Sequence, residues 1–148
     1  SLAGHGFDRI YFLNGHGGNI ATVTAAFSEI YADMGESAPK LKLHNWFMGP
    51  RTRKLCKELY GDAEGSHATP SEVALAWHAW PETEKHMPIE PRIAPRGVIR
   101  GAADYRRQFP DGRIGSDPSL ATIADGGRIL EAAVADVREN FAAFARES

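Results

Sequence analysis

This chain of 148 residues has a single cysteine, a small net charge and no long apolar run. The single cysteine, Cys56, cannot form an internal disulfide and fits a reducing compartment. A net charge of −2 gives no reason to expect nucleic acid or an anionic membrane as a partner. Because no run of about 18 apolar residues occurs, no segment is predicted to span a bilayer. The opening residues also lack a secretory signal pattern, so we expect a cytoplasmic protein.

The apolar residues that are present alternate between strand and helix patterns. A short run at 10–13 predicts a buried strand, and a second strand is predicted over 40–47. Between them, one helical face is predicted from apolar residues at spacings of three and four: Ile20, Val23, Phe27, Ile30 and Met34. A further helix is predicted over 52–60, and another has Val73, Ala76, Trp77 and Trp80 on one side. This order indicates a layered α/β protein.

The second half of the chain is more irregular. Proline and glycine interrupt residues 81–118, which predicts a long loop with a role in function or in subunit contacts. Asp117 as N-cap and Pro118 at the first helical position predict the start of the last helix. Gly126 and Gly127 lie inside that helix, and we expect them to allow close helix packing.

The most informative segment is 14–19, which reads Asn-Gly-His-Gly-Gly-Asn and directly follows the first predicted strand. In open α/β sheets, ligands bind where strands end and helices begin. The neighbouring glycines leave the His16 imidazole accessible and let the backbone approach a ligand closely. The alternative is a histidine that merely ends a strand.

This segment resembles the signature of the creatininase family of metal-dependent amidohydrolases. Three other segments resemble parts of the same family, and all occur in the family's order: 2–10 before the first strand, 67–72 with its His-Ala pair and later Glu, and 115–121 before the last helix. The resemblance implies a creatininase-like three-layer α/β/α fold with a mostly parallel sheet. We expect residues 1–148 to be the C-terminal portion of one such domain, lacking its N-terminal strands.

The resemblance also implies a cofactor, namely divalent metal, with two zinc or manganese ions expected. His16 is the strongest candidate ligand. Asn14 and Asn19 are poor ligands for these metals, so we expect them to hold the loop, orient His16 or grip the substrate. In the family, most of the remaining ligands come from a Glu-x-His-Gly segment and a later Asp that precede the part matched here.

Glu72 has two competing interpretations. The resemblance assigns it to the metal site, where it also serves catalysis. Its local sequence predicts a capping box instead, with Thr69 at the N-cap, Pro70 at N1 and Glu72 at N3. We expect these roles to exclude each other. Gly18 stands where the family's namesake enzyme has a metal-binding carboxylate. Either Glu72 replaces that carboxylate, as we expect, or one metal site is weakened, and the difference argues against creatinine as the substrate.

Two further residues are candidates for the site. His67 is predicted to be catalytic, as a proton shuttle, a third metal ligand or a substrate-gripping side chain, and the alternative is a loop histidine that only makes hydrogen bonds. Trp46 lies at the end of the second predicted strand and could line an apolar substrate pocket or pack in the core.

The predicted function is therefore metal-dependent hydrolysis of an amide or formamide C–N bond in a non-peptide or small-molecule substrate. The expected partners are that substrate and further copies of the chain, because the family forms ring-like oligomers. The alternative is a non-catalytic fragment or degenerate paralogue that serves as a structural or oligomerisation unit.

Overall fold

A computed structural model describes residues 1–147 of the chain. The chain divides into two compact units, the first formed by Ser1–Thr52 with Ala133–Ser148 and the second by Arg53–Ala132. Both units carry secondary structure, and each is described by itself. The expectation that the chain is part of a single domain stays a prediction.

The first unit contains a pair of parallel strands, β1 (Arg9–Asn14) and β2 (Lys40–Asn45), connected by helix α1 (Asn19–Met34). Both strands and this helix were predicted from the sequence. The register pairs Asn14 with Asn45, so both strands end at the same level. The predicted second strand was two residues too long, because Trp46–Met48 form a 3-10 turn, η3.

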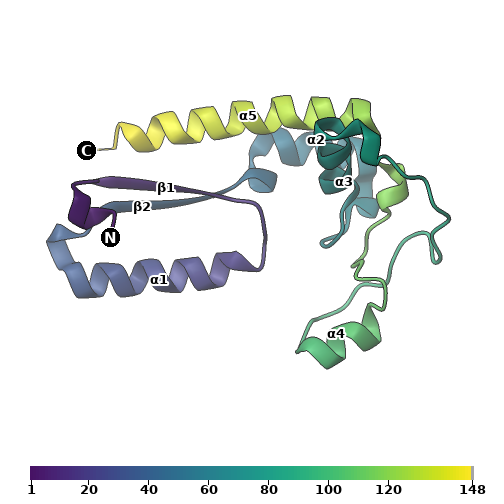
Figure 1. Cartoon of the computed structure of the whole chain (residues 1–148), viewed down its shortest axis with the longest axis horizontal. Helices are drawn as coiled ribbons and strands as arrows, with labels where there is room; N and C mark the ends of the chain where they lie inside the picture. The colour runs from purple at the N-terminus through teal and green to yellow at the C-terminus, as the bar shows by residue number, and fades with distance from the viewer. Residues whose placement is uncertain (148) are drawn as a thin grey trace. The chain divides into compact units, whose positions relative to one another are not determined.

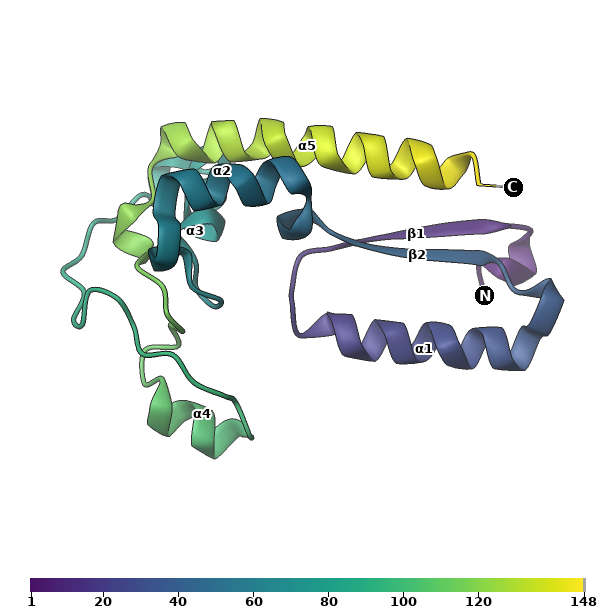
Figure 2. The ribbon, with the colours of Figure 1, turned by 180° about the vertical axis from the view of Figure 1, so that it is seen from behind.

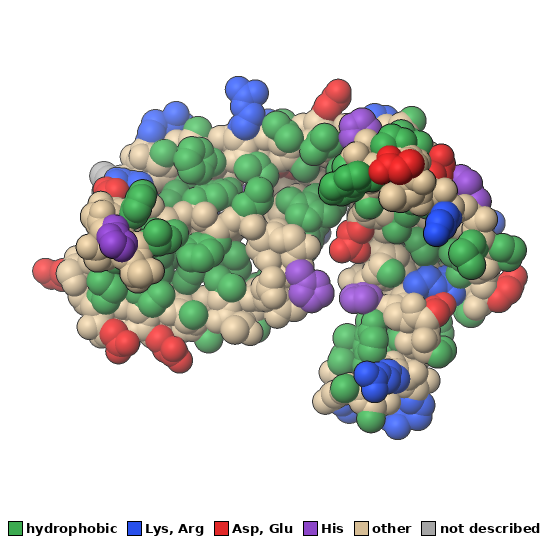
Figure 3. Space-filling model, in the orientation of Figure 1, with side chains coloured by type: hydrophobic (Ala, Val, Ile, Leu, Met, Phe, Trp, Pro, Cys, Tyr) green, Lys and Arg blue, Asp and Glu red, His purple; other side chains and the backbone are tan. Residues whose placement is uncertain are grey.

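Helices cover both faces of this sheet (Figures 1 and 2). On one face, the Tyr11 ring contacts Phe141 and Phe144 of the long last helix α5 (Ile123–Ala145). On the other face, Phe12 packs against Phe27 of α1. Adjacent residues of a strand point to opposite faces, so this alternation produces the predicted three layers of helix, sheet and helix. Figure 3 shows apolar side chains gathered over this unit.

The second unit is helical, with irregular connections. It contains most of α2 (Pro50–Tyr60), all of α3 (Pro70–Ala79), a short helix α4 (Ala102–Gln108) and the first part of α5. The 81–118 segment lacks a long element, as expected, although α4 was not predicted. The core of this unit gathers side chains from α2, α3, α5 and the 109–114 segment: Tyr60, Ala74, Trp77, Phe109, Ile114 and Ile129.

The predicted start of the last helix was wrong. Asp117 caps only a 3-10 turn, η6 (Pro118–Leu120), by accepting a hydrogen bond from the Ser119 amide. Ala121 is extended, and α5 begins after Thr122, whose hydroxyl accepts a hydrogen bond from the Asp125 amide at 3.0 Å. Thr122 therefore provides the cap that the sequence had assigned to Asp117.

The glycine pair in α5 lies against α3, which confirms the expected close helix packing. A Cβ atom at Gly126 would lie 2.0 Å from the Ala74 carbonyl oxygen. At Gly127 the nearest atom is the tip of the flexible His78 side chain, 3.1 Å away. Only Gly126 thus faces backbone that cannot move aside.

Alanine substitutions at the two glycines should differ in their effect on the free energy of unfolding. Gly126→Ala is expected to lower the free energy of unfolding by about 2 kcal/mol through overpacking. Gly127→Ala is the matched control, expected to be neutral or stabilising by up to about 1 kcal/mol because alanine favours helix. Urea unfolding of both variants measures this difference, and equal stabilities would contradict the packing described.

Candidate active site

The loop after β1 is fixed by the side chain of Asn14, which is buried. Its amide nitrogen donates to the Asn45 side-chain oxygen at 2.6 Å and to the His16 carbonyl at 2.7 Å. Its oxygen accepts from the His16 amide at 3.2 Å and from the Asn19 side chain at 3.0 Å. One buried amide thus ties the end of β2, the loop and the first residue of α1 together.

His16 is exposed on this loop. Its backbone amide donates to the Asn14 side chain, and its backbone carbonyl accepts from the same side chain. A Cβ atom at Gly18 would lie 2.7 Å from the ring nitrogen Nε2. The ring therefore lies over Gly18, and a side chain at that position would have to push it aside.

Trp46 begins the 3-10 turn after β2 and is half-buried, with its ring edge-on to Phe47 at 5.8 Å between centroids. Its role in a substrate pocket stays a prediction. Asn45, directly before it, was not among the predicted site residues. Its contact with Asn14 follows from the parallel register, which the sequence does not state.

In the second unit, the backbone of His67 pairs with residue 114. A β-bridge joins His67 and Ile114, with the Ser66 amide donating to the Ile114 carbonyl at 2.9 Å. The Ser116 hydroxyl donates to the His67 carbonyl at 2.6 Å. Two segments that resemble the family separately, 67–72 and 115–121, are thereby joined.

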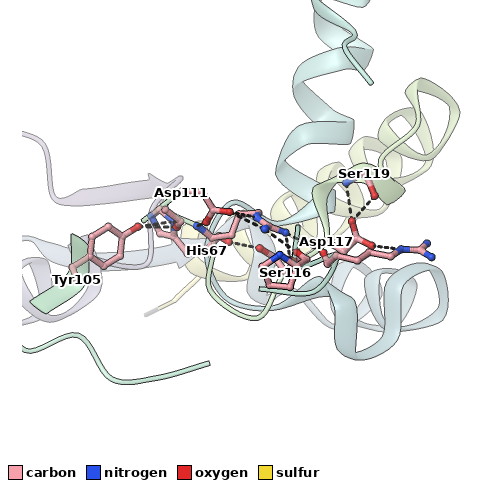
Figure 4. Close-up of polar contacts among 10 residues, drawn as sticks. His67, Tyr105, Asp111, Ser116, Asp117 and Ser119 are labelled. Atoms are coloured by element: carbon pink, nitrogen blue, oxygen red, sulfur yellow. Dashed lines mark hydrogen bonds and ion pairs between the residues drawn. The ribbon is translucent and has the colours of Figure 1, made fainter. Parts of the chain in front are cut away.

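The His67 side chain is oriented by a turn of this same segment (Figure 4). Its ring nitrogen Nδ1 lies 2.6 Å from the Gly112 carbonyl, which also accepts a hydrogen bond from the Tyr105 hydroxyl at 2.7 Å. Because a carbonyl oxygen can only accept, Nδ1 carries the proton. In the neutral ring, the lone pair is then on Nε2.

Glu72 forms the capping box that its local sequence predicted. Its carboxylate oxygen Oε2 accepts from the Thr69 amide and the Thr69 hydroxyl, both at 3.0 Å, and the Glu72 amide donates to that hydroxyl at 3.2 Å. Glu72 is exposed at the start of α3. Its assignment to a metal site stays a prediction, and these bonds engage one of its two oxygens.

An ion-pair network next to His67 was not predicted. Arg113 is buried and donates to the Asp111 carboxylate at 2.8 Å and to backbone carbonyls of Pro91, Arg92 and Ser116. The Arg113 side chain holds the pKa of Asp111 below its usual value. These bonds connect the 91–92 and 111–116 segments.

Asp117 extends this network and is also buried. It accepts hydrogen bonds from Ser119 and, at 2.8 Å, from the Arg92 guanidinium (Figure 4). Burial alone would raise the pKa of Asp117, but the bonds from Ser119 and Arg92 outweigh it and lower the pKa. Burial raises the pKa of the Cys56 thiol to about 11, so that thiol is neutral near pH 7.

Ligand-type side chains are dispersed in the part of the chain that the structure describes. Among residues 1–147, no three histidine, cysteine, aspartate or glutamate side chains gather closely enough to hold a metal ion. The structure brings Asn14, His16 and Asn19 together in the first unit. It places His67 and Glu72 in the second unit, on one short segment.

Comparison with known proteins agrees with this α/β architecture. The profile of the creatininase family, described as creatinine amidohydrolase, matches residues 1–141. The chain therefore belongs to the creatininase family, which is a family of amidohydrolases. No curated protein matches the sequence.

Solved structures show the same fold. A crystal structure of creatinine amidohydrolase (creatininase) matches with a TM-score of 0.75 and 18% identity, covering 99% of this chain and 60% of that one. A tryptophan-to-phenylalanine mutant of creatininase matches with a TM-score of 0.69 and 21% identity, covering 95% of this chain and 59% of that one. A glutamate-to-glutamine mutant of creatininase, described as Zn-Zn type, matches with a TM-score of 0.68 and 20% identity, covering 95% of this chain and 59% of that one.

The chain thus spans about 60% of the length of the creatininases that it matches. None of the helices formed by residues 1–147 is long and apolar enough to cross a membrane.

Proposed function

We propose that the protein is a metal-dependent amidohydrolase that cleaves a C–N amide or formamide bond in a non-peptide or small-molecule substrate. The observation that carries this proposal is the loop after β1. There a buried asparagine fixes the backbone on both sides of an exposed imidazole, at the carboxyl end of a parallel strand. This is the position at which α/β proteins bind ligands.

The residues of this chain fit part of a metal site. In the first unit, the exposed imidazole of His16 is a donor that zinc and manganese accept. In the second unit, one oxygen of the Glu72 carboxylate is engaged in the cap, so a role for Glu72 as a metal ligand depends on release of the cap or on its second oxygen. Each unit thus offers one proposed donor, and a complete metal site requires further ligands. When bound, the metal activates a water molecule and polarises the amide carbonyl. The Zn-Zn description of a related creatininase supports zinc.

His67 is suited to proton transfer in this reaction. The Gly112 carbonyl holds the proton on Nδ1 and thereby fixes the tautomer and the ring orientation. When Nε2 is protonated, it can donate to the nitrogen that leaves from the cleaved amide. The hydrogen bonds of Asn14 to the His16 carbonyl and to the Asn19 side chain hold the backbone of the loop that carries the imidazole.

Removal of metal tests this proposal on the full-length protein. Dialysis against a chelator is expected to abolish hydrolysis of formamide-type substrates, and zinc or manganese is expected to restore it. Hydrolysis that persists after metal has been removed, as checked by elemental analysis, would refute the proposal. A protein that neither binds metal nor cleaves any amide would be the structural or oligomerisation unit instead. The same proposal includes a cytoplasmic location and a homo-oligomeric assembly.

A further inference from the structure

A cavity of about 710 Å³ opens in the second unit. Its walls come from α3 (Val73, Trp77), from the 85–90 segment (Met87, Ile89) and from the 111–119 segment. Small-molecule sites commonly have volumes of about 300–1,000 Å³. The cavity is therefore large enough for a ligand well beyond the size of formamide.

The cavity is mainly apolar. Trp77 and Met87 both line the cavity, and Trp77 is 8% exposed whereas Met87 is 69% exposed. A large apolar side chain that is left in water gains stability when a ligand covers it. Lys85 and Glu90 also line the cavity and carry opposite charges, so no single sign of ligand charge is favoured.

The charged residues at the edge of the cavity, Asp111 and Arg113, also do not favour a charged ligand. Arg113 and Asp111 form this edge, and they pair with each other at 2.7 Å. The guanidinium also donates to the carbonyls of Pro91, Arg92 and Ser116, which uses its remaining donors. Because Arg113 is occupied within the protein, an uncharged group fits this edge best.

The same edge lies next to His67. Asp111 and Arg113 flank Gly112, whose carbonyl accepts the hydrogen bond from His67 Nδ1. Ala68 also lines the cavity and follows His67 directly, with a φ of 51° that is rare for a residue other than glycine. Such backbone strain persists where the surroundings enforce it and is common at ligand sites.

We propose that this cavity binds an uncharged, apolar group of the substrate, so that the substrate is an amide or formamide carrying an aryl or branched alkyl group. This inference rests on the proposed function, since it assigns the cavity to the same reaction. The apolar group lies in the cavity, and the bond to be cleaved extends toward His67.

Binding of a neutral fluorescent probe tests the cavity without relying on catalysis. N-phenyl-1-naphthylamine is expected to bind the full-length protein and to be displaced by formanilide. Met87→Trp, which fills the cavity, and Ile89→Arg, which places a charge in its wall, are expected to weaken probe binding about tenfold or more. Val98→Trp and Ile93→Arg are the matched controls, because both residues are exposed, apolar and outside the cavity wall.

The substrate preference provides the second measurement. The protein is expected to hydrolyse formanilide with a kcat/KM about tenfold or more above that for formamide, and Met87→Trp is expected to reduce this ratio. Probe binding that is the same in all four variants, or equal kcat/KM values for both substrates, would overturn the inference. Probe binding as expected, without hydrolysis of either amide, would refute the proposed function while supporting the cavity as a ligand site.

Discussion

Replacing His16 with alanine is expected to remove bound zinc or manganese from the full-length protein and to lower amide hydrolysis roughly 100-fold or more. The substitution deletes a proposed metal ligand but leaves the loop in place. Asn14 binds the backbone amide and carbonyl of residue 16, and alanine keeps both groups. Metal content by elemental analysis and kcat/KM on a formamide substrate measure the two effects.

His5→Ala is the control for this experiment. His5 is also an exposed histidine of the first unit, in a 3-10 turn before β1. Its removal is expected to leave metal content and activity unchanged. A His16→Ala protein with full metal content and full activity would contradict the role proposed for this loop.

Replacing Asp136 with alanine is expected to lower the free energy of unfolding by about 3 kcal/mol. The Asp136 side chain has no exposed surface, although it lies in a long helix with solvent on one side. It accepts from the Thr52 amide at 2.9 Å and the Thr52 hydroxyl at 3.0 Å, and so caps the start of α2. Gly49 leaves room for it, since a Cβ there would lie 2.2 Å from the carboxylate.

The stability that Asp136 provides should depend on pH. Burial alone would raise the pKa of Asp136, but the hydrogen bonds from Thr52 and Arg51 lower it below the ordinary value of 3.8. A lowered pKa in the folded state means that the carboxylate stabilises the fold above about pH 4. That contribution is lost as the pH falls through the folded-state pKa.

Denaturant unfolding of Asp136→Asn and the unmodified protein between pH 2 and pH 7 measures this dependence. The difference in stability is expected to be largest near neutral pH and to shrink below about pH 4. Glu139→Ala is the control, because Glu139 binds the same Arg51 but is largely exposed, and little change is expected. A difference that does not vary with pH would contradict the account of Asp136.

The features that the sequence predicted are those whose local structure is determined by residues close together in the sequence. The helix over 19–34 follows from apolar periodicity and the glycine after it. The capping box at Thr69 follows from residues only three apart. The location of the His16 loop follows from a strand that ends in asparagine and glycine.

The features that the sequence did not predict depend on contacts between distant residues. Arg113 is a charged residue in an irregular loop, where an exposed side chain is the normal expectation. It is buried instead, and it donates hydrogen bonds to the carbonyls of Pro91 and Arg92, about 20 residues earlier in the sequence. Asp136 lies among apolar residues of α5 and caps a helix 84 residues earlier. The Asn14–Asn45 contact requires the register of the two strands.

The last helix shows how a local rule can mislead. Asp117 and Pro118 have the sequence of a helix start, and Asp117 does cap the turn that follows. Thr122, paired with Asp125, makes a second cap five residues later, and the long helix begins there. Two capping sequences in succession cannot be ranked from the sequence alone, because tertiary packing selects between them.

The most direct test of the central claim is a crystal structure of the full-length protein with zinc bound, with anomalous scattering measured at the zinc absorption edge. The account predicts an anomalous peak about 2.0–2.1 Å from a ring nitrogen of His16. A zinc peak bound elsewhere, with the His16 imidazole outside its ligand set, would contradict it.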